Sequence, residues 1–159
     1  MNINIVTVGK IKEKYLKDAI EEYKKRLSRF CKLTIIELPD EAMSDKPSQS
    51  EINAILKKEG EKILSYLKNT DVLISLCVEG KQMSSEKFAA FIDDSCVAGA
   101  SSFTFVIGGS LGLFDEVKKK STLRLSFSEM TFPHQLMRVV LLEQIYRAFK
   151  INANESYHK

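Results

Sequence analysis

FTFVIGGSLGLFDEV, residues 103–117, joins an apolar run to a charged segment through three glycines, Gly108, Gly109 and Gly112. The run FTFVI is typical of a buried strand, and the following DEVKKK is typical of a short helix. Glycine lets the backbone adopt a positive φ, and it lets a ligand approach the chain without meeting a Cβ atom. This strand–loop–helix unit predicts an α/β fold with a binding site at the glycines.

Strand-like and helix-like segments alternate along the whole chain. We expect strands at 2–8, 32–38, 71–80, 103–108 and 123–128. We expect helices at 12–30, 50–67, 84–97, 115–120 and 134–149. This alternation predicts the α/β class, with a mostly parallel sheet and helices on both of its faces. The almost entirely apolar segment 71–80 agrees with a strand that is covered on both faces.

Three expectations concern individual helices. In helix 12–30 the spacing of three or four predicts an apolar face made of Tyr15, Ala19, Tyr23, Leu27 and Phe30. Ser50 is the expected N-cap of the second helix. The helix at 134–149 is apolar on more than one side, which favours burial against its own sheet and either a deeper core position or contact with a second subunit.

Composition restricts the class of protein. With 159 residues, of which 44% are hydrophobic and 28% charged, the chain is expected to form one soluble globular domain over residues 1–159. No apolar stretch approaches the ~18 residues of a membrane span. Cys31, Cys77 and Cys96 are odd in number and far apart, as in buried thiols of a reducing cytoplasm. With only His134 and His158 as further ligands, we expect no metal site.

Charge is distributed unevenly although the net charge is only +3. Residues 10–32 hold nine Lys/Arg and four Asp/Glu, a net charge of +5. Residues 33–115 hold seven and thirteen, a net charge of −6, and residues 116–159 hold eight and four, a net charge of +4. Two basic ends around an acidic middle suit a polyanionic partner, and they equally suit ordinary solvated helix faces.

Known phosphate-binding motifs do not match the glycine segment. A P-loop needs GK[ST], but Leu113 follows Gly112. The dinucleotide fingerprint GxGxxG would need glycine at position 107, where the chain has Ile107. Because Glu129 lies 20 residues after Gly109, as a ribose ligand would, a nicotinamide-dependent enzyme stays open as an alternative. The cysteines have no electropositive setting that the sequence reveals, so the sequence indicates no cysteine nucleophile. The residues alone thus predict an α/β domain with a pocket for a nucleotide-like ligand.

Longer stretches of the sequence carry a resemblance. The segment SFSEMTFPHQLMRVVLLEQIYRAF (126–149), the preceding FVIGGSLG, the opening VTVGKIKEKY and the final YHK closely resemble the bacterial ribosomal RNA large subunit methyltransferase H family of the SPOUT class. The resemblance implies transfer of a methyl group from S-adenosylmethionine to N3 of a pseudouridine in large-subunit ribosomal RNA, with the ribosome as substrate. It also implies a cytoplasmic homodimer and a carboxy-terminal trefoil knot over roughly residues 103–149.

The resemblance also implies roles for individual residues. Leu76 is expected to line the cofactor pocket, and Gly108 to contact the cofactor through its backbone. The remaining expected cofactor residues are consecutive, namely Phe127, Ser128, Glu129, Met130, Thr131 and Phe132. Tyr157 and His158 are expected to reach the active site of the partner subunit and hold the target base, since a tyrosine ring can stack on a base.

Catalytic roles are less defined by the sequence. N3 of pseudouridine must lose a proton, and His134 or His158 could accept it, as could solvent or an RNA phosphate. Our hypothesis is that Arg138 contacts phosphate or the developing anion. The alternative role of this side chain is a surface salt bridge. A ribosome-associated RNA-binding protein without catalytic activity is the alternative function from a different class.

Overall fold

The computed structural model describes residues 1–158 and contains one five-stranded sheet in which every pairing is parallel. The strands are β1 (Asn2–Val8), β2 (Lys32–Leu38), β3 (Val72–Gln82), β4 (Ser102–Ile107) and β5 (Leu123–Ser126). Their order across the sheet is β2-β1-β4-β3-β5. The carboxyl ends of all five strands therefore meet at one edge, where α/β proteins bind their ligands.

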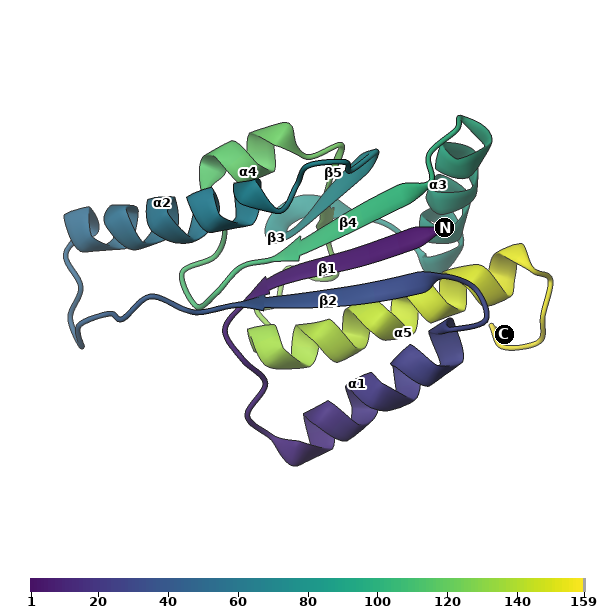
Figure 1. The fold of residues 1–159 in the computed structure, drawn as a ribbon, viewed down its shortest axis with the longest axis horizontal. Helices are drawn as coiled ribbons and strands as arrows, with labels where there is room; N and C mark the ends of the chain where they lie inside the picture. Colours follow the sequence, from purple (N-terminus) through teal and green to yellow (C-terminus); the bar gives the residue numbers. More distant parts are fainter. Residues whose placement is uncertain (159) are drawn as a thin grey trace.

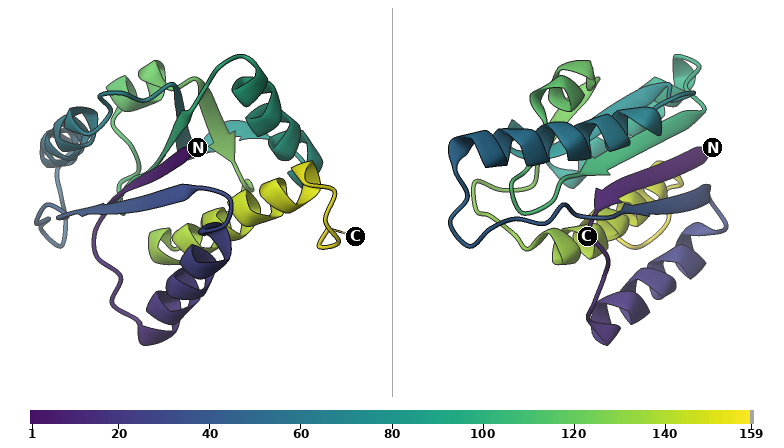
Figure 2. Two further views of the ribbon diagram at one scale, coloured as in Figure 1. Left: turned by 45° about the vertical axis from the view of Figure 1, so that its right-hand side comes forward. Right: turned by 60° about the vertical axis from the view of Figure 1, so that its left-hand side comes forward.

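Helices cover both faces of this sheet (Figures 1 and 2). They are α1 (Lys14–Leu27), α2 (Gln49–Ser65), α3 (Ser85–Val97), α4 (Asp115–Lys120) and α5 (His134–Asn152). On one face α5 lies between α1 and α3, and α2 packs with α4 on the other face. The expected class, a parallel sheet with helices on both faces, is confirmed.

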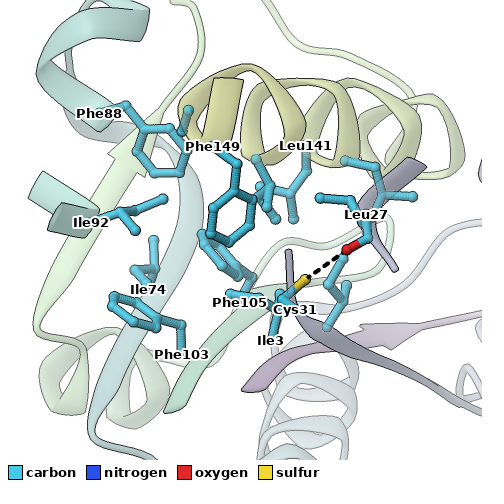
Figure 3. Close-up of a cluster of buried hydrophobic side chains, with 14 of the residues drawn as sticks. Ile3, Leu27, Cys31, Ile74, Phe88, Ile92, Phe103, Phe105, Leu141 and Phe149 are labelled. Atoms are coloured by element: carbon cyan, nitrogen blue, oxygen red, sulfur yellow. Dashed lines mark hydrogen bonds between the residues drawn. The ribbon is translucent and has the colours of Figure 1, made fainter. Parts of the chain in front are cut away.

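The larger hydrophobic core lies under α1, α3 and α5. It combines Ile3, Ile74 and Phe105 from the strands with side chains of these helices, such as Leu141 (Figure 3). Alternate strand residues such as Val6 point to the opposite core under α2 and α4. This alternation follows from the two-residue repeat of a strand, and it explains why the central strands read as continuous apolar runs.

Two details of the helices differ from expectation. The N-cap of α2 is Ser48, whose side chain accepts a hydrogen bond from the Glu51 backbone N–H, and Ser50 lies inside the helix. Tyr15 is 68% exposed, and the buried face of α1 instead begins at Leu16 and Ile20. Both errors are shifts of one or two positions, because neighbouring apolar or hydroxyl residues fit the same pattern.

Three further expectations concern a membrane span, the cysteines and the knot. Among the described residues no helix is long and apolar enough to cross a membrane. The free thiol of Cys31 is buried, as expected, and points to the Leu27 carbonyl (Figure 3), whereas Cys77 and Cys96 are only half-buried. Strand order does not define the threading of a chain, so the trefoil knot stays a prediction.

Candidate functional site

A cavity of about 870 Å³ opens at the carboxyl edge of the sheet, beside the ends of β4 and β5 and residues 76–79 within β3. Seven of the eight residues expected to contact a cofactor line it, namely Leu76, Gly108, Phe127, Ser128, Met130, Thr131 and Phe132. Glu129 is exposed and is not part of the lining. Segments that lie far apart in the sequence thus converge because parallel strands end at the same edge.

The glycine segment between β4 and α4 folds back on itself and forms one wall. Gly109 and Gly112 form an isolated antiparallel bridge, with the Gly112 N–H donating to the Gly109 carbonyl over 3.1 Å. A Cβ atom on Gly108 would lie 2.2 Å from the Gly112 carbonyl oxygen. The closest neighbour of Gly108 is therefore the chain's own backbone, and the glycine is required before any ligand arrives.

Gly112 has a different reason to be glycine. Its φ is +87°, in the left-handed region, and a Cβ at this position would meet nothing within 4 Å. A side chain there would be strained by the backbone conformation alone. The two glycines together fix the tight turn that shapes the cavity wall.

The opposite wall is the segment 127–132, which follows β5. Its conformation is held by short polar contacts: the Ser126 hydroxyl donates to the Ser128 carbonyl over 3.0 Å, and the Met130 N–H donates to the Ser128 hydroxyl over 3.0 Å. Met130 is 75% exposed and Phe132 38% exposed, unusually high values for such apolar side chains. A wall of exposed apolar side chains fits a flat heterocycle such as adenine.

Sequence reasoning missed part of this lining. Asn53 and Leu56 of α2 and Met137 of α5 also face the cavity. No motif surrounds these residues, and the helical spacing of Leu56 and Met137 is the spacing of ordinary core positions. Only the packing of α2 and α5 against the sheet identifies them.

His134, the first residue of α5, lies at the wall of the cavity, half-buried. Burial lowers the pKa of its imidazole, the positive charge of Arg138 lowers it further, and Asp40 opposes both effects. His134 is therefore neutral at pH 7, with one ring nitrogen able to donate a hydrogen bond and the other able to accept one. His134 can thus serve a ligand in the cavity as hydrogen-bond donor or proton acceptor.

Arg138 lies one turn further along α5, and the structure places it differently from our hypothesis. Its side chain is 1% exposed. Nη1 lies 2.7 Å from Glu37 Oε1, and Nη2 donates to the carbonyls of Val8 and Gly9 over 3.0 and 2.7 Å. Burial lowers its pKa, and Glu37 opposes that effect. The guanidinium is neither on the surface nor free for phosphate, and it ties the start of α5 to the end of β1.

Tyr157 and His158 lie against the last helix of their own chain. The Tyr157 ring packs edge-on against Tyr146 with a centroid distance of 5.0 Å, and Arg147 lies 4.8 Å from the Tyr157 centroid. His158 Nε2 lies 2.7 Å from Glu86 Oε1. Neither residue lines the cavity of its own chain.

The distance along α5 explains this separation. Tyr157 contacts Glu143, which is nine residues after His134, and a helix rises about 1.5 Å per residue. The tail contacts therefore lie roughly 14 Å along the helix from the cavity wall.

Burial is the main reason that the pKa of Cys77, which lines the cavity, is raised, so its thiol is protonated at neutral pH. Within residues 1–158 no group of three His, Cys, Asp or Glu side chains could hold a metal ion.

Comparisons with known proteins agree with this geometry. A family model described as "Predicted SPOUT methyltransferase" matches residues 1–158. A protein named "Ribosomal RNA large subunit methyltransferase H" from Clostridium acetobutylicum is 59% identical to this chain, over 100% of both sequences.

Solved structures share the fold at low identity. The structure of a "Probable Methyltransferase" from Bordetella pertussis aligns with 92% of this chain and 93% of its own, with a TM-score of 0.58 and 10% identity. A methyltransferase from Legionella pneumophila, solved with its bound cofactor SAM, aligns with 94% of this chain and 66% of its own, with a TM-score of 0.50 and 11% identity. At such identities the likeness shows the fold alone.

Proposed function

This chain belongs to the ribosomal RNA large subunit methyltransferase H family of SPOUT methyltransferases, and we propose that it transfers a methyl group from S-adenosylmethionine to N3 of a pseudouridine in large-subunit ribosomal RNA. We further propose that it acts in the cytoplasm, as one domain per subunit, on the assembled ribosome. The observation that carries the proposal is the cavity in which the glycine segment faces residues 127–132.

The lining suits S-adenosylmethionine in shape and chemistry. Leu76, Phe127 and Phe132 offer apolar surface to the adenine ring, while Gly108 and the 127–132 backbone offer hydrogen-bonding groups at the strand ends. The cofactor supplies a methyl group that is already activated by its sulfonium. The protein therefore mainly has to align this group with the target nitrogen and exclude water.

The target nitrogen lies in a weakly acidic imide, so its proton must be removed for the reaction. His134 is one candidate acceptor, since it is neutral at pH 7 and lies at the cavity wall. Arg138 supports His134 by holding the first turn of α5 against β1, and it does not contact the substrate in our proposal.

We propose a homodimer in which the tail of one subunit completes the site of the other. The tail lies away from its own cavity, which supports action on a partner's cavity. Leu136 is 38% exposed at the start of α5, as expected for a helix that a second subunit covers. Tyr157 would then stack on the target base, and the basic α1 would contact phosphates of the ribosomal RNA.

The test is incubation of the purified protein with labelled S-adenosylmethionine and ribosomes that lack the modification, followed by digestion of the RNA to nucleosides. We expect label in N3-methylpseudouridine. Ribosome binding without label would instead favour the non-catalytic RNA-binding alternative. Binding of a nicotinamide cofactor that S-adenosylmethionine fails to displace would favour the dehydrogenase alternative.

A further inference from the structure

A second cavity of about 240 Å³ lies beside the first. The two share four lining residues, Gly109, Ser110, Leu111 and His134, so they are separated only by the glycine segment and the start of α5. The volume corresponds to about eight water molecules at roughly 30 Å³ each, and a uracil base has eight non-hydrogen atoms, each of which takes less room than a water molecule. The second cavity is therefore large enough for one pyrimidine base next to a cofactor in the first.

Glu59 of α2 lines this second cavity, although it is only 6% exposed. Its Oε1 accepts a hydrogen bond from the Glu41 backbone N–H over 3.1 Å. Its Oε2 lies against the glycine segment, since a Cβ built on Gly109 would be 3.5 Å away from it. Within the described residues no side chain or backbone group donates to Oε2. Oε2 is therefore an acceptor that a donor group of a ligand in the second cavity can use.

The surroundings of Glu59 also favour proton uptake. Burial is the largest cause of its raised pKa, the carboxylates of Asp40 and Glu41 raise it further, and the Glu41 N–H and Lys62 oppose the shift. Lys62 and Lys58 are paired with Glu41 rather than with Glu59. A carboxylate in this setting binds a proton more tightly than an exposed one, as a general base requires.

We propose that the second cavity receives the imide edge of the target base and that Glu59 accepts the N3 proton. The inference rests on the proposed function and deepens it. An imide presents one N–H between two carbonyl oxygens. Glu59 Oε2 matches the N–H, and the N–H of neutral His134, on the wall of the same cavity, matches a carbonyl. Cytosine, which has no N3 proton, would leave Oε2 without a donor.

The N3–H bond breaks as the proton moves to Glu59 Oε2. The N3 electron pair forms the new bond to the methyl carbon while the bond from that carbon to sulfur breaks, and the sulfur keeps its electron pair. Water then takes the proton from Glu59, which returns to the carboxylate.

The experiment must distinguish proton transfer by Glu59 from a purely structural role, because Glu59 Oε1 also accepts a hydrogen bond from the loop that contains Glu41. Glu59→Gln keeps the size and the accepting oxygen but cannot take up the proton. The matched control is Glu61→Gln, two residues further along α2, where the side chain is 61% exposed. Calorimetry with S-adenosylhomocysteine and sedimentation with ribosomes verify that both variants still bind.

Two readouts test the inference. The first is the single-turnover methylation rate on unmodified ribosomes, where we expect Glu59→Gln to lose about 100-fold or more and Glu61→Gln to match the wild type. The second needs no catalysis. A carbodiimide that reacts with N3 of unpaired pseudouridine probes the target in complexes made with S-adenosylhomocysteine. We expect the wild type to protect N3 and Glu59→Gln to leave it reactive.

A Glu59→Gln rate within threefold of the wild type would overturn the inference, and so would full protection of N3 by that variant. If the wild-type protein itself places no label on N3, the proposed function fails instead. The two failures are therefore distinguishable.

Discussion

Replacing Gly108 by alanine tests whether the glycine segment is shaped by its own backbone. The added Cβ would lie 2.2 Å from the Gly112 oxygen and 2.6 Å from the Gly112 carbonyl carbon, whereas ordinary contacts begin near 3.4 Å. The Gly112 peptide must therefore move by about 1 Å, which breaks its 3.1 Å hydrogen bond to Gly109. Overpacking costs about 1–3 kcal/mol and the lost hydrogen bond about 1 kcal/mol, so we expect a loss of roughly 2–4 kcal/mol in unfolding free energy.

The assay is urea unfolding combined with calorimetric titration of S-adenosylmethionine. Since the displaced wall lines the cavity, we expect the affinity of Gly108→Ala to fall at least about tenfold, equivalent to about 1.4 kcal/mol. Gly112→Ala is the matched control in the same turn: it meets no atom within 4 Å and carries only the strain of φ +87°, about 1–2 kcal/mol. If Gly108→Ala were no less stable than Gly112→Ala and bound the cofactor as the wild type does, our account of the turn would be wrong.

Three further predictions follow from the buried charge, the tail and a thiol. Arg138→Met should lower the unfolding free energy by about 2–4 kcal/mol, because Glu37 and two backbone carbonyls lose the donor that Arg138 supplies. Urea unfolding measures this free energy, and a loss below about 1 kcal/mol would contradict the prediction. Deleting residues 157–159 should leave the affinity for S-adenosylmethionine, measured by calorimetry, unchanged and should abolish methylation of ribosomes. If the shortened chain still methylates ribosomes, the tail is not part of the site. Burial raises the pKa of Cys31 to about 11, so iodoacetamide at pH 8 should not alkylate this thiol in the folded protein. Mass spectrometry measures the alkylation, and rapid modification of Cys31 would contradict its burial.

The alternation of strands and helices could be predicted from the sequence because each signal is local. Helix DEVKKK was expected at the positions of α4, and β1 and β2 also have their expected bounds. The strand order β2-β1-β4-β3-β5 could not be predicted, since it depends on pairings between segments up to 100 residues apart. Local patterns carry no information about such partners.

Arg138 shows the same limit within the site. On a helix, an arginine four residues after a histidine predicts an exposed cation, whereas this arginine is buried because Val8, Gly9 and Glu37 offer acceptors to it. Those acceptors lie more than 100 residues away in the chain. The burial of Glu59 could not be predicted for a similar reason, since in the sequence Glu59 is one of several charged residues on an amphipathic helix. Its burial depends on the glycine segment and on Glu41.

The position of β5 at the edge of the sheet has a consequence for the order in which the enzyme becomes active during its synthesis. Four of the five strands end by Ile107, so most of the sheet can pair before the last third of the chain is made. The wall formed by residues 127–132 and the start of α5 are translated only afterwards. A nascent chain can therefore gain much of its hydrophobic core while it still has no closed cavity, and cofactor binding would stabilise only chains whose synthesis has passed α5.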